Sequence, residues 1–368
     1  MLKIAVVFGT RPEAIKMAPL INELKKQNAW ETRVIVSGQH REMLDQVLRI
    51  FKIKPDCDLQ VMRAQQSLSE ITIRVLEGLN TVFRKWRPDL VLVHGDTTTA
   101  LAGALAGFYW KIPIGHVEAG LRTPTIWNPF PEEANRRLID VLSSLYFAPT
   151  ERAAENLRGE GIEPGQVFVT GNTVIDALLS VVREDYLFRD PILQQLDLSK
   201  PLLIVTAHRR ENWGDPLRTV CQALLAIGER CRCEIVVAMH RNPVLQEIFL
   251  GLLGQAPHIK LIEAPDYLEF ANLLAKSTLL LTDSGGLQEE APALGKPVLV
   301  LREVTERPEG VEAGTVKLVG TEKETIISSV CSLLEDKGLY AKMSKAQNPY
   351  GDGSAARRIR QIIEEKYR

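Results

Sequence analysis

Short apolar runs alternate with longer amphipathic stretches along the first part of the chain. Runs of strand length lie at residues 3–8, 33–37, 90–94, 112–117, 145–148 and 167–170. Apolar positions at helical spacing occupy the stretches between them, at residues 12–25, 40–50, 68–86, 98–110, 131–144 and 151–158. Strands that alternate with helices in this way predict a parallel sheet with helices on both faces.

The alternation is interrupted at residues 184–200 and then starts again. The second series predicts strands at residues 202–206, 234–238, 259–262, 279–281, 298–301 and 315–319, with helices between them. We therefore predict an α/β protein with two Rossmann-like, doubly wound domains, residues 1–170 and 171–354, and a ligand cleft between the domains. The final helix, at residues 355–368, is predicted to pack back on the first domain.

Length and composition agree with a two-domain globular protein. The chain has 368 residues, more than one typical core contains. A formal net charge of -1 gives no reason to expect nucleic acid or an anionic membrane as a partner. No apolar run approaches membrane-spanning length, and the first run is too short for a signal peptide. We therefore predict a cytoplasmic protein.

The cysteines and histidines do not form a recognisable metal motif. An odd and scattered set of cysteines predicts reduced cytosolic thiols rather than disulfides: Cys57, Cys221, Cys231, Cys233 and Cys331. Cys231 and Cys233 lack a second pair of ligands, so they are interpreted as structural. The histidines that end strands follow no paired metal spacing: His94, His116 and His240. No metal site is predicted.

A glycine turn follows the apolar run at residues 279–281. Gly285 and Gly286 allow the backbone to approach a ligand closely, and a helix predicted from residue 287 would direct its first N–H groups toward an anion. Ser284 belongs to the same turn, and Glu290 lies one helical turn further on, where its carboxylate could accept hydrogen bonds from ribose hydroxyls. Shape alone favours an ordinary strand–helix turn, so the hypothesis of an anion site depends on the other strand ends.

Those strand ends carry charged residues in both halves of the chain. Asp96, Glu118 and Glu132 supply carboxylates in the first half. The alternative for two of them is structural, because Asp96 could cap a helix and Glu132 could complement a helix dipole. Cations that could neutralise a diphosphate occur at three strand ends or loops: Arg11, His208 and Arg307.

The first strand is not followed by GxGxxG, and GxxxxGK[ST] is absent, so a dinucleotide dehydrogenase and a P-loop nucleotidase are disfavoured. The charges instead suit a sugar joined to a nucleoside diphosphate. Two reactions fit: transfer of the sugar to an acceptor, or acid–base chemistry on the sugar itself. The cluster of carboxylates favours the second reaction, because abstraction of a proton from carbon needs a base and a matching acid.

Eight segments together resemble the non-hydrolysing UDP-N-acetylglucosamine 2-epimerases. They are FGTRPEAIKMAPL, GQHREMLDQVL, VHGDTTTALAGALA, HVEAGLRT, FPEEANRRLID, TAHRREN, LTDSGGLQEEAPALGKPVLVLREVTERPE and NPYGDG. The resemblance covers nearly the whole chain. It implies a fold like the two-domain glycosyltransferases of the B type and reversible conversion of UDP-N-acetylglucosamine to UDP-N-acetylmannosamine. It further implies elimination and re-addition of UDP through a 2-acetamidoglucal, without metal or nicotinamide cofactor.

The resemblance also assigns roles to residues. It implies catalytic roles for Asp96, Glu118, Glu132 and His208. It implies substrate binding, chiefly of UDP, by Arg11, Lys16, Phe270, Ser284, Gly285, Gly286, Glu290 and Arg307. A second, activating UDP-N-acetylglucosamine site is implied at Gln39, His40, Gln66, Arg209 and His240. Two departures are Pro265, where some members carry Gln, and Gln65, where some regulated members carry Arg.

The resemblance implies a homodimer, and three other functions remain as alternatives. The first is the same chemistry on a related sugar, such as UDP-2,3-diacetamido-2,3-dideoxyglucuronic acid, which would share the nucleotide site. The second is a glycosyltransferase on the same scaffold, which would need an acceptor and leave C2 untouched. The third is a non-catalytic nucleotide-sugar sensor, which the surplus of carboxylates disfavours.

Overall fold

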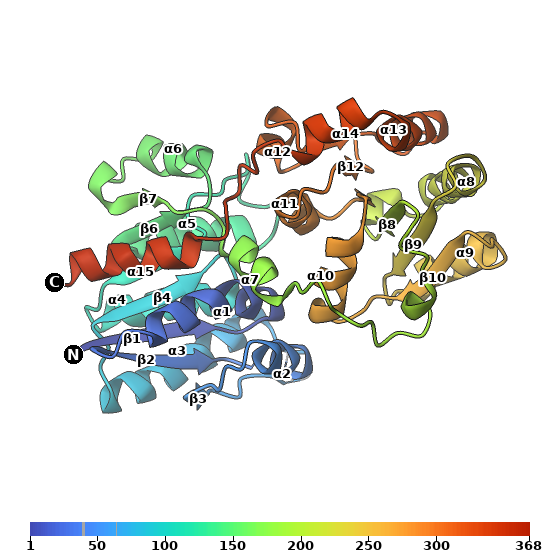
Figure 1. Ribbon diagram of the computed structural model, residues 1–368. Coiled ribbons are helices and arrows are strands. Elements are labelled where there is room, and N and C mark those ends of the chain that lie inside the picture. The colour runs from blue at the N-terminus through green and yellow to red at the C-terminus, as the bar shows by residue number, and fades with distance from the viewer. Residues whose placement is uncertain (39–40, 64) are drawn as a thin grey trace. The chain divides into compact units, whose positions relative to one another are not determined.

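The computed structural model describes residues 1–38, 41–63 and 65–368, and these residues form two units (Figure 1). The first unit comprises Met1–Ser180 and Tyr350–Arg368, and the second comprises Val181–Pro349. Residues 171–180 thus belong to the first unit, although the sequence analysis placed them in the second domain. In the part of the chain that is described, no helix is long and apolar enough to cross a membrane.

A parallel sheet of seven strands forms the centre of the first unit, in the order β3-β2-β1-β4-β5-β6-β7. Both faces are covered by helices, so strands such as β1 and β4 are apolar on both sides. The strands are β1 (Leu2–Phe8), β2 (Trp30–Val36), β3 (Cys57–Asp58), β4 (Leu90–His94), β5 (Ile114–Val117), β6 (Leu145–Ala148) and β7 (Val167–Val169). The helices are α1 (Arg11–Lys25), α2 (Arg41–Ile50), α3 (Leu68–Lys85), α4 (Thr98–Tyr109), α5 (Glu132–Leu142), α6 (Glu151–Gly159), η1 (Pro164–Gln166), α7 (Thr173–Val181) and α15 (Ala355–Lys366).

The second unit contains a parallel sheet of six strands in the order β10-β9-β8-β11-β12-β13. One face is covered by α8 and α13, which pack against each other. The strands are β8 (Leu202–Thr206), β9 (Glu234–Met239), β10 (Ile259–Glu263), β11 (Leu279–Thr282), β12 (Val298–Val300) and β13 (Val316–Leu318). The helices are η2 (Leu193–Gln195), η3 (Arg210–Asn212), α8 (Asp215–Arg230), α9 (Pro243–Leu253), α10 (Tyr267–Lys276), α11 (Gly285–Ala293), α12 (Pro308–Glu312), α13 (Lys323–Glu335) and α14 (Lys337–Ser344).

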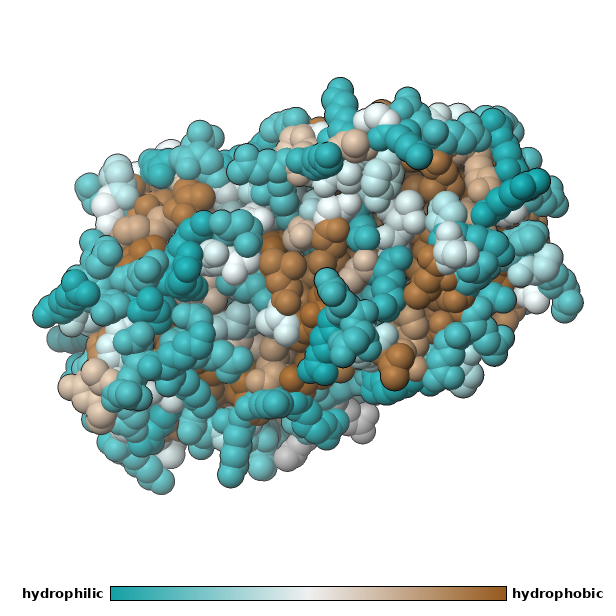
Figure 2. Space-filling model, viewed as in Figure 1, coloured by the Kyte–Doolittle hydropathy of each residue, from teal (hydrophilic) through white to brown (hydrophobic). Residues whose placement is uncertain are grey.

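The C-terminal helix α15 is part of the first unit, where it packs against α1. Its buried residues repeat at helical spacing, with Ile359 and Ile363 fully covered. Hydrophilic side chains occupy its outer side in Figure 2. Asp176 of α7 accepts hydrogen bonds from the backbone N–H groups of Ala355 and Ala356 at 3.2 and 2.9 Å. A carboxylate from α7 therefore satisfies donors at the start of α15.

Several elements differ from the sequence-based expectation. The helix after β11 begins at Gly285, not at residue 287, so the glycine pair forms the first helical turn rather than the loop before it. The elements β3, α12 and α14 were not predicted. β3 and α12 are too short to show a period, and their positions depend on pairing with β2 and on packing next to β13.

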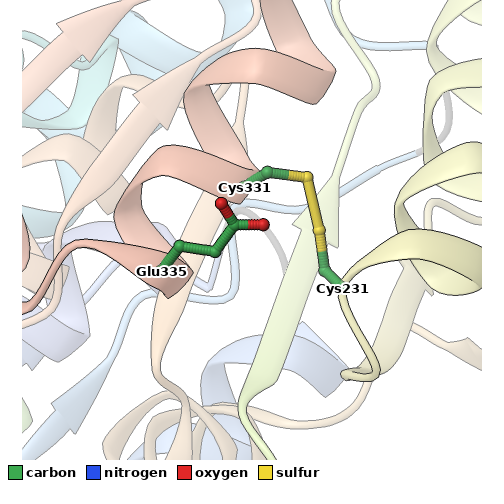
Figure 3. Close-up of side chains that lie close together, drawn as sticks. All are labelled: Cys231, Cys331 and Glu335. Atoms are coloured by element: carbon green, nitrogen blue, oxygen red, sulfur yellow. A yellow bond between two sulfur atoms is a disulfide. The ribbon is translucent and has the colours of Figure 1, made fainter.

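The prediction that all cysteines are reduced is wrong for one pair. Cys231, which caps α8, and Cys331 of α13 form a disulfide, and Glu335 lies beside it (Figure 3). Their Cα atoms are 6.2 Å apart although 100 residues separate them in sequence. The packing of α8 on α13 brings the two sulfurs together, and no sequence spacing reveals that packing. The disulfide also removes the cysteine-based reason for predicting a cytoplasmic location, since such bonds are rare there.

Candidate functional site

Glu118 lies directly after β5, at the carboxyl end of the first sheet. Its Oε2 atom accepts hydrogen bonds from the Lys16 ammonium and from Nδ2 of Asn172, the latter at 2.9 Å. Nε2 of His94, the last residue of β4, lies 3.6 Å from the same oxygen. The fold thus brings Lys16, His94 and Asn172, which lie far apart in the sequence of the first unit, to one carboxylate.

The surroundings of Glu118 favour its ionised form. Burial raises the pKa of this carboxyl, but the positive charge of Lys16 and the neighbouring His94 outweigh burial and hold the pKa well below its usual range. Its backbone φ of 65° is uncommon for an L-residue and is a conformation that often marks functional sites. A carboxylate must be ionised to accept a proton, and Glu118 meets this requirement.

Asp96 follows β4 and is held by α5. Nη2 and Nε of Arg136 lie 2.5 and 3.2 Å from its Oδ2 atom, and Nδ2 of Asn135 donates to its backbone carbonyl at 2.8 Å. The Asp96 side chain remains 26% exposed. Glu132 is the first residue of α5, and because residues four apart share a helix face, it lies on the side that carries Arg136. The first unit therefore contains the three predicted carboxylates near one end of its sheet.

Arg11, a predicted ligand of the diphosphate, is exposed at the first position of α1. The loop before it is fixed by the buried Glu13, which sequence reasoning missed. Glu13 accepts hydrogen bonds from the backbone N–H groups of Gly9 and Thr10 at 3.1 and 2.8 Å, and from Oγ1 of Thr97 at 2.7 Å. The spacing of Thr10 and Glu13 is that of a capping box, a signal available from the sequence.

A second buried network supports the loop that carries Asp96. Nε2 of His116 lies 2.7 Å from the Gly95 carbonyl, and its Nδ1 lies 2.6 Å from Asp140 Oδ1. Nη2 of Arg122 donates to the other Asp140 oxygen at 2.7 Å. Burial raises the pKa of Asp140, but the effects of His116 and Arg122 are larger together. The pKa of Asp140 is therefore lower than its usual value. His116 is thus a buried histidine with both ring nitrogens in hydrogen-bond contact, and it supports the loop that carries Asp96.

The second unit carries the predicted nucleotide-binding residues. Ser284 is the N-cap of α11, but its side chain makes no capping hydrogen bond, so it does not occupy the first-turn N–H groups. Those N–H groups belong to a turn that begins with Gly285 and Gly286. Side chains added at these glycines would stand between the helix terminus and a ligand. Uncapped N–H groups and a helix dipole together form an anion site.

The loop between β12 and α12 is tied to the start of α11. The buried Gln288 accepts a hydrogen bond from Oγ1 of Thr305 at 2.6 Å and donates to the Ser284 carbonyl at 3.1 Å. Arg307 follows on the same loop and forms an ion pair with Glu289. The predicted ribose ligand, Glu290, folds back toward the helix start, since its Oε1 lies 3.7 Å from the position of a Cβ on Gly286.

Charged side chains from neighbouring strands approach the same helix terminus. Nη2 of Arg209 and Oε2 of Glu306 lie 3.3 Å apart, and 3.6 and 3.8 Å from the position of a Cβ on Gly285. The imidazole of His208, after β8, stacks on that of His240, after β9, with ring centroids 5.6 Å apart. Predicted catalytic and nucleotide-binding residues of this unit therefore lie around one end of its sheet.

The remaining predicted residues are distributed as follows. Phe270 is partly buried on α10 and packs against a core cluster. Gln39 and His40 lie outside the described residues. Gln66 bonds within its own loop, accepting from the Arg63 N–H at 2.8 Å and donating to the Val61 carbonyl at 2.5 Å. Within the second unit, Arg209 and His240 lie beside other predicted residues, Arg209 near Gly285 and His240 against His208.

The chain is similar to known proteins over nearly its whole length. A family model described as UDP-N-acetylglucosamine 2-epimerase matches residues 22–364. The UDP-N-acetylglucosamine 2-epimerase of Bacillus subtilis is 53% identical over 359 residues, which are 97% of this chain and 94% of that protein. The crystal structure of UDP-GlcNAc 2-epimerase from Neisseria meningitidis bound to UDP-GlcNAc is 48% identical, with a TM-score of 0.86, and covers 99% of this chain and 100% of that chain. The glycotransferase of kitacinnamycin shares the fold alone, with a TM-score of 0.68 at 12% identity over 99% of this chain and 98% of its own.

Proposed function

Because this chain belongs to the UDP-N-acetylglucosamine 2-epimerase family, we propose that it interconverts UDP-N-acetylglucosamine and UDP-N-acetylmannosamine. The observation that carries the proposal is the largely buried Glu118 carboxylate, which accepts a hydrogen bond from the Lys16 ammonium. A base of this kind serves proton removal from carbon, which epimerisation at C2 requires and sugar transfer does not.

In the proposed reaction the second unit holds UDP while the first unit acts on the sugar. Glu118 takes the C2 proton, the C2–H electrons form the C1–C2 double bond, and the C1–O bond breaks with its electrons leaving on UDP. The products of this step are a 2-acetamidoglucal and the UDP anion. Return of a proton to the opposite face of C2, with attack of UDP at C1, gives the epimer. No net oxidation or reduction occurs, so the chemistry needs no nicotinamide.

The C2 proton is weakly acidic, so stabilisation of the departing UDP is as important as the base. The N-terminus of α11 and the cations Arg11, His208 and Arg307 are proposed to share this charge. Asp96 and Glu132 are the proposed acids for the opposite face of C2.

Proton NMR of UDP-N-acetylglucosamine with the purified protein in D2O tests the proposal. We expect loss of the C2 proton signal and appearance of the manno epimer. Folded protein that produces neither exchange nor epimer would overturn it. The same experiment with UDP-2,3-diacetamido-2,3-dideoxyglucuronic acid distinguishes the alternative substrate, since the preferred sugar will exchange faster.

Neutralising the carboxylates one at a time tests their roles. Asp96→Asn, Glu118→Gln and Glu132→Gln are each expected to lower kcat by about 100-fold or more. Glu77→Gln, at an exposed position of α3, is the matched control and should keep normal turnover. Near-normal turnover in all three site variants would contradict the carboxylate mechanism.

A homodimer is proposed as the working assembly. Large apolar side chains are exposed on two helices that pack together, α4 and α5. Tyr109 ends α4 and is 67% exposed, while Leu138 and Val141 of α5 are 51% and 81% exposed. Apolar surface of this kind on neighbouring helices is typical of an interface. Light scattering should give twice the monomer mass, and Val141→Glu should shift the protein toward monomer.

A further inference from the structure

Asp283 is a buried carboxylate that none of the proposed steps uses. It lies directly after β11 and before Ser284, at the start of the nucleotide half-site. Its Oδ2 atom accepts three hydrogen bonds, from the backbone N–H groups of His208 and Arg209, both at 2.8 Å, and from Nδ2 of Asn212 at 3.0 Å. One side chain therefore fixes the loop of His208 relative to the terminus of α11.

The other oxygen of Asp283 faces the imidazole of His208. Oδ1 lies 3.2 Å from Nδ1 of His208 and is buried without a hydrogen-bond partner in this structure. A buried carboxylate oxygen that lacks a donor is costly, and the Nδ1–H group is a donor within reach after a small ring rotation. A proton on Nδ1 leaves Nε2 as the ring nitrogen that can receive a second proton. The His208 side chain is 36% exposed, so the ring is accessible to a ligand.

We propose that Asp283 is a positioning residue that selects the Nδ1–H tautomer of His208 and stabilises its imidazolium when a nucleoside diphosphate binds. The inference rests on the proposed function for its biological role, but the tautomer itself is a property of the free protein. On binding, Nε2 takes one proton from solvent and donates it in a hydrogen bond to a phosphate oxygen, while the Nδ1–H group faces Oδ1 of Asp283. The leaving UDP then meets a cation that is already oriented.

The charges around His208 agree with this arrangement. Burial lowers the pKa of its imidazole, Asp283 opposes that effect, and His240 and Arg209 lower the pKa further. Arg209 is itself paired with Glu306. The imidazole of the free protein is therefore poised toward its neutral form, and the anionic ligand supplies the interaction that favours protonation. Without Asp283, the remaining charged neighbours of the ring, His240 and Arg209, would both disfavour the imidazolium.

The substitution Asp283→Asn separates the two functions of the carboxylate. Its amide oxygen can still accept from the two backbone N–H groups, so its amide nitrogen must face Nδ1 of His208. An N–H donor in that place requires an unprotonated Nδ1 and therefore selects the Nε2–H tautomer. Asn212→Ala is the matched control, because it removes one hydrogen bond to Oδ2 and leaves Oδ1 unchanged.

Nitrogen-15 NMR of histidine-labelled protein tests the inference directly, with His208 assigned by its loss in His208→Gln. We expect the Nδ1–H tautomer in the unmodified chain and in Asn212→Ala, and the Nε2–H tautomer in Asp283→Asn. We also expect Asp283→Asn to lower kcat by roughly 100-fold or more and to move the alkaline limb of the kcat/KM profile to lower pH, since the imidazolium has lost its carboxylate.

The same His208 tautomer in all folded forms would overturn the inference. If Asp283→Asn does not fold, an Nε2–H tautomer of His208 in the unmodified chain would overturn it, and the Nδ1–H tautomer there would support it. If all three proteins show the expected His208 tautomers but the unmodified chain has no epimerase activity, the positioning role of Asp283 stands. Only the proposed function is then refuted. The two failures are therefore distinguishable.

Discussion

The Lys16 ammonium on α1 donates a hydrogen bond to the Glu118 carboxylate after β5, although 102 residues separate them in the chain. Nδ2 of Asn172 contacts the same carboxylate oxygen at 2.9 Å. Folding thus organises the charge of the proposed base before any substrate arrives. Both of these partners of Glu118 belong to the first unit, as Glu118 itself does.

Removal of Lys16 should shift the pH dependence of the reaction. Glu118 acts as a base only when ionised, and its lowered pKa places the acid limb of kcat/KM at low pH. Lys16→Met removes the positive charge, so the pKa of Glu118 should rise and the acid limb should move up by about 1–3 pH units. Lys26→Met, which removes an exposed lysine at the C-terminal end of the same helix, is the control and should leave the profile unchanged. An unshifted acid limb in Lys16→Met would argue against Glu118 as the base.

The same pair should affect stability in a defined pH window. The pKa of Glu118 is lower in the folded state than in the unfolded state, so its stabilising contribution is present above the unfolded pKa. This contribution is lost as pH falls through the folded pKa. Chemical denaturation of the unmodified chain and Glu118→Gln should therefore show a difference in free energy of unfolding at pH 7 that shrinks as the solution is acidified.

A methyl group at Gly285 should weaken nucleotide binding without preventing folding. The added Cβ would meet Arg209 and Glu306 atoms at 3.6 and 3.8 Å, which are ordinary contacts. It would nevertheless narrow the approach to the first-turn N–H groups of α11, so we expect Gly285→Ala to bind UDP roughly tenfold more weakly or worse by calorimetry. Gly251→Ala, where an added Cβ meets nothing within 4 Å, is the matched control. Equal UDP affinities in the two variants would rule out this anion site.

Reduction of the disulfide should destabilise the second unit. The bond between Cys231 and Cys331 closes a loop of about 100 residues, so its loss should lower the free energy of unfolding by about 2–5 kcal/mol. Denaturation with and without a thiol reductant measures this effect. Cys231→Ser should be insensitive to the reductant. A native chain that is equally insensitive, with two free thiols by mass spectrometry after alkylation, would show that the bond does not form in solution.

The junction between α7 and α15 should depend on Asp176. Its carboxylate accepts the N–H groups of Ala355 and Ala356, so Asp176→Ala should cost about 1–2 kcal/mol and loosen the final helix. Asp352→Ala removes an exposed ion pair with Arg358 nearby and should cost less than about 1 kcal/mol. Hydrogen exchange in residues 355–366 provides the measurement. Equal protection of this helix in both variants would contradict the capping role of Asp176.

Much of the architecture could be read from local patterns. Buried parallel strands must be apolar on both faces, so β4 and β11 appear in the sequence as continuous apolar runs. The predicted class of two Rossmann-like α/β units is confirmed by the two all-parallel sheets and by the matched structures. The family resemblance is likewise confirmed by the match over residues 22–364. These features rest on residues that are neighbours along the chain.

One error occurred where distant contacts decide the outcome, and another at the boundary of a helix. The sulfurs of Cys231 and Cys331 meet only because α8 packs on α13. Gly285 joins α11 because first-turn residues need no helical partner for their N–H groups, so a glycine there carries little cost and no periodic signal. The supporting role of Glu13 was visible as a capping box, but its bond to Thr97 was not.

By itself, the sequence determined most of the strands and helices, the family to which the chain belongs and which polar residues follow the strands. It did so because hydrophobic period, turn chemistry and motifs are local properties. Only the tertiary structure decided that Lys16 would lower the pKa of Glu118, that Arg136 would hold Asp96 and that Asp283 would face His208. Those relationships depend on distances between side chains far apart in sequence, and a pKa or a tautomer follows from such distances rather than from residue type.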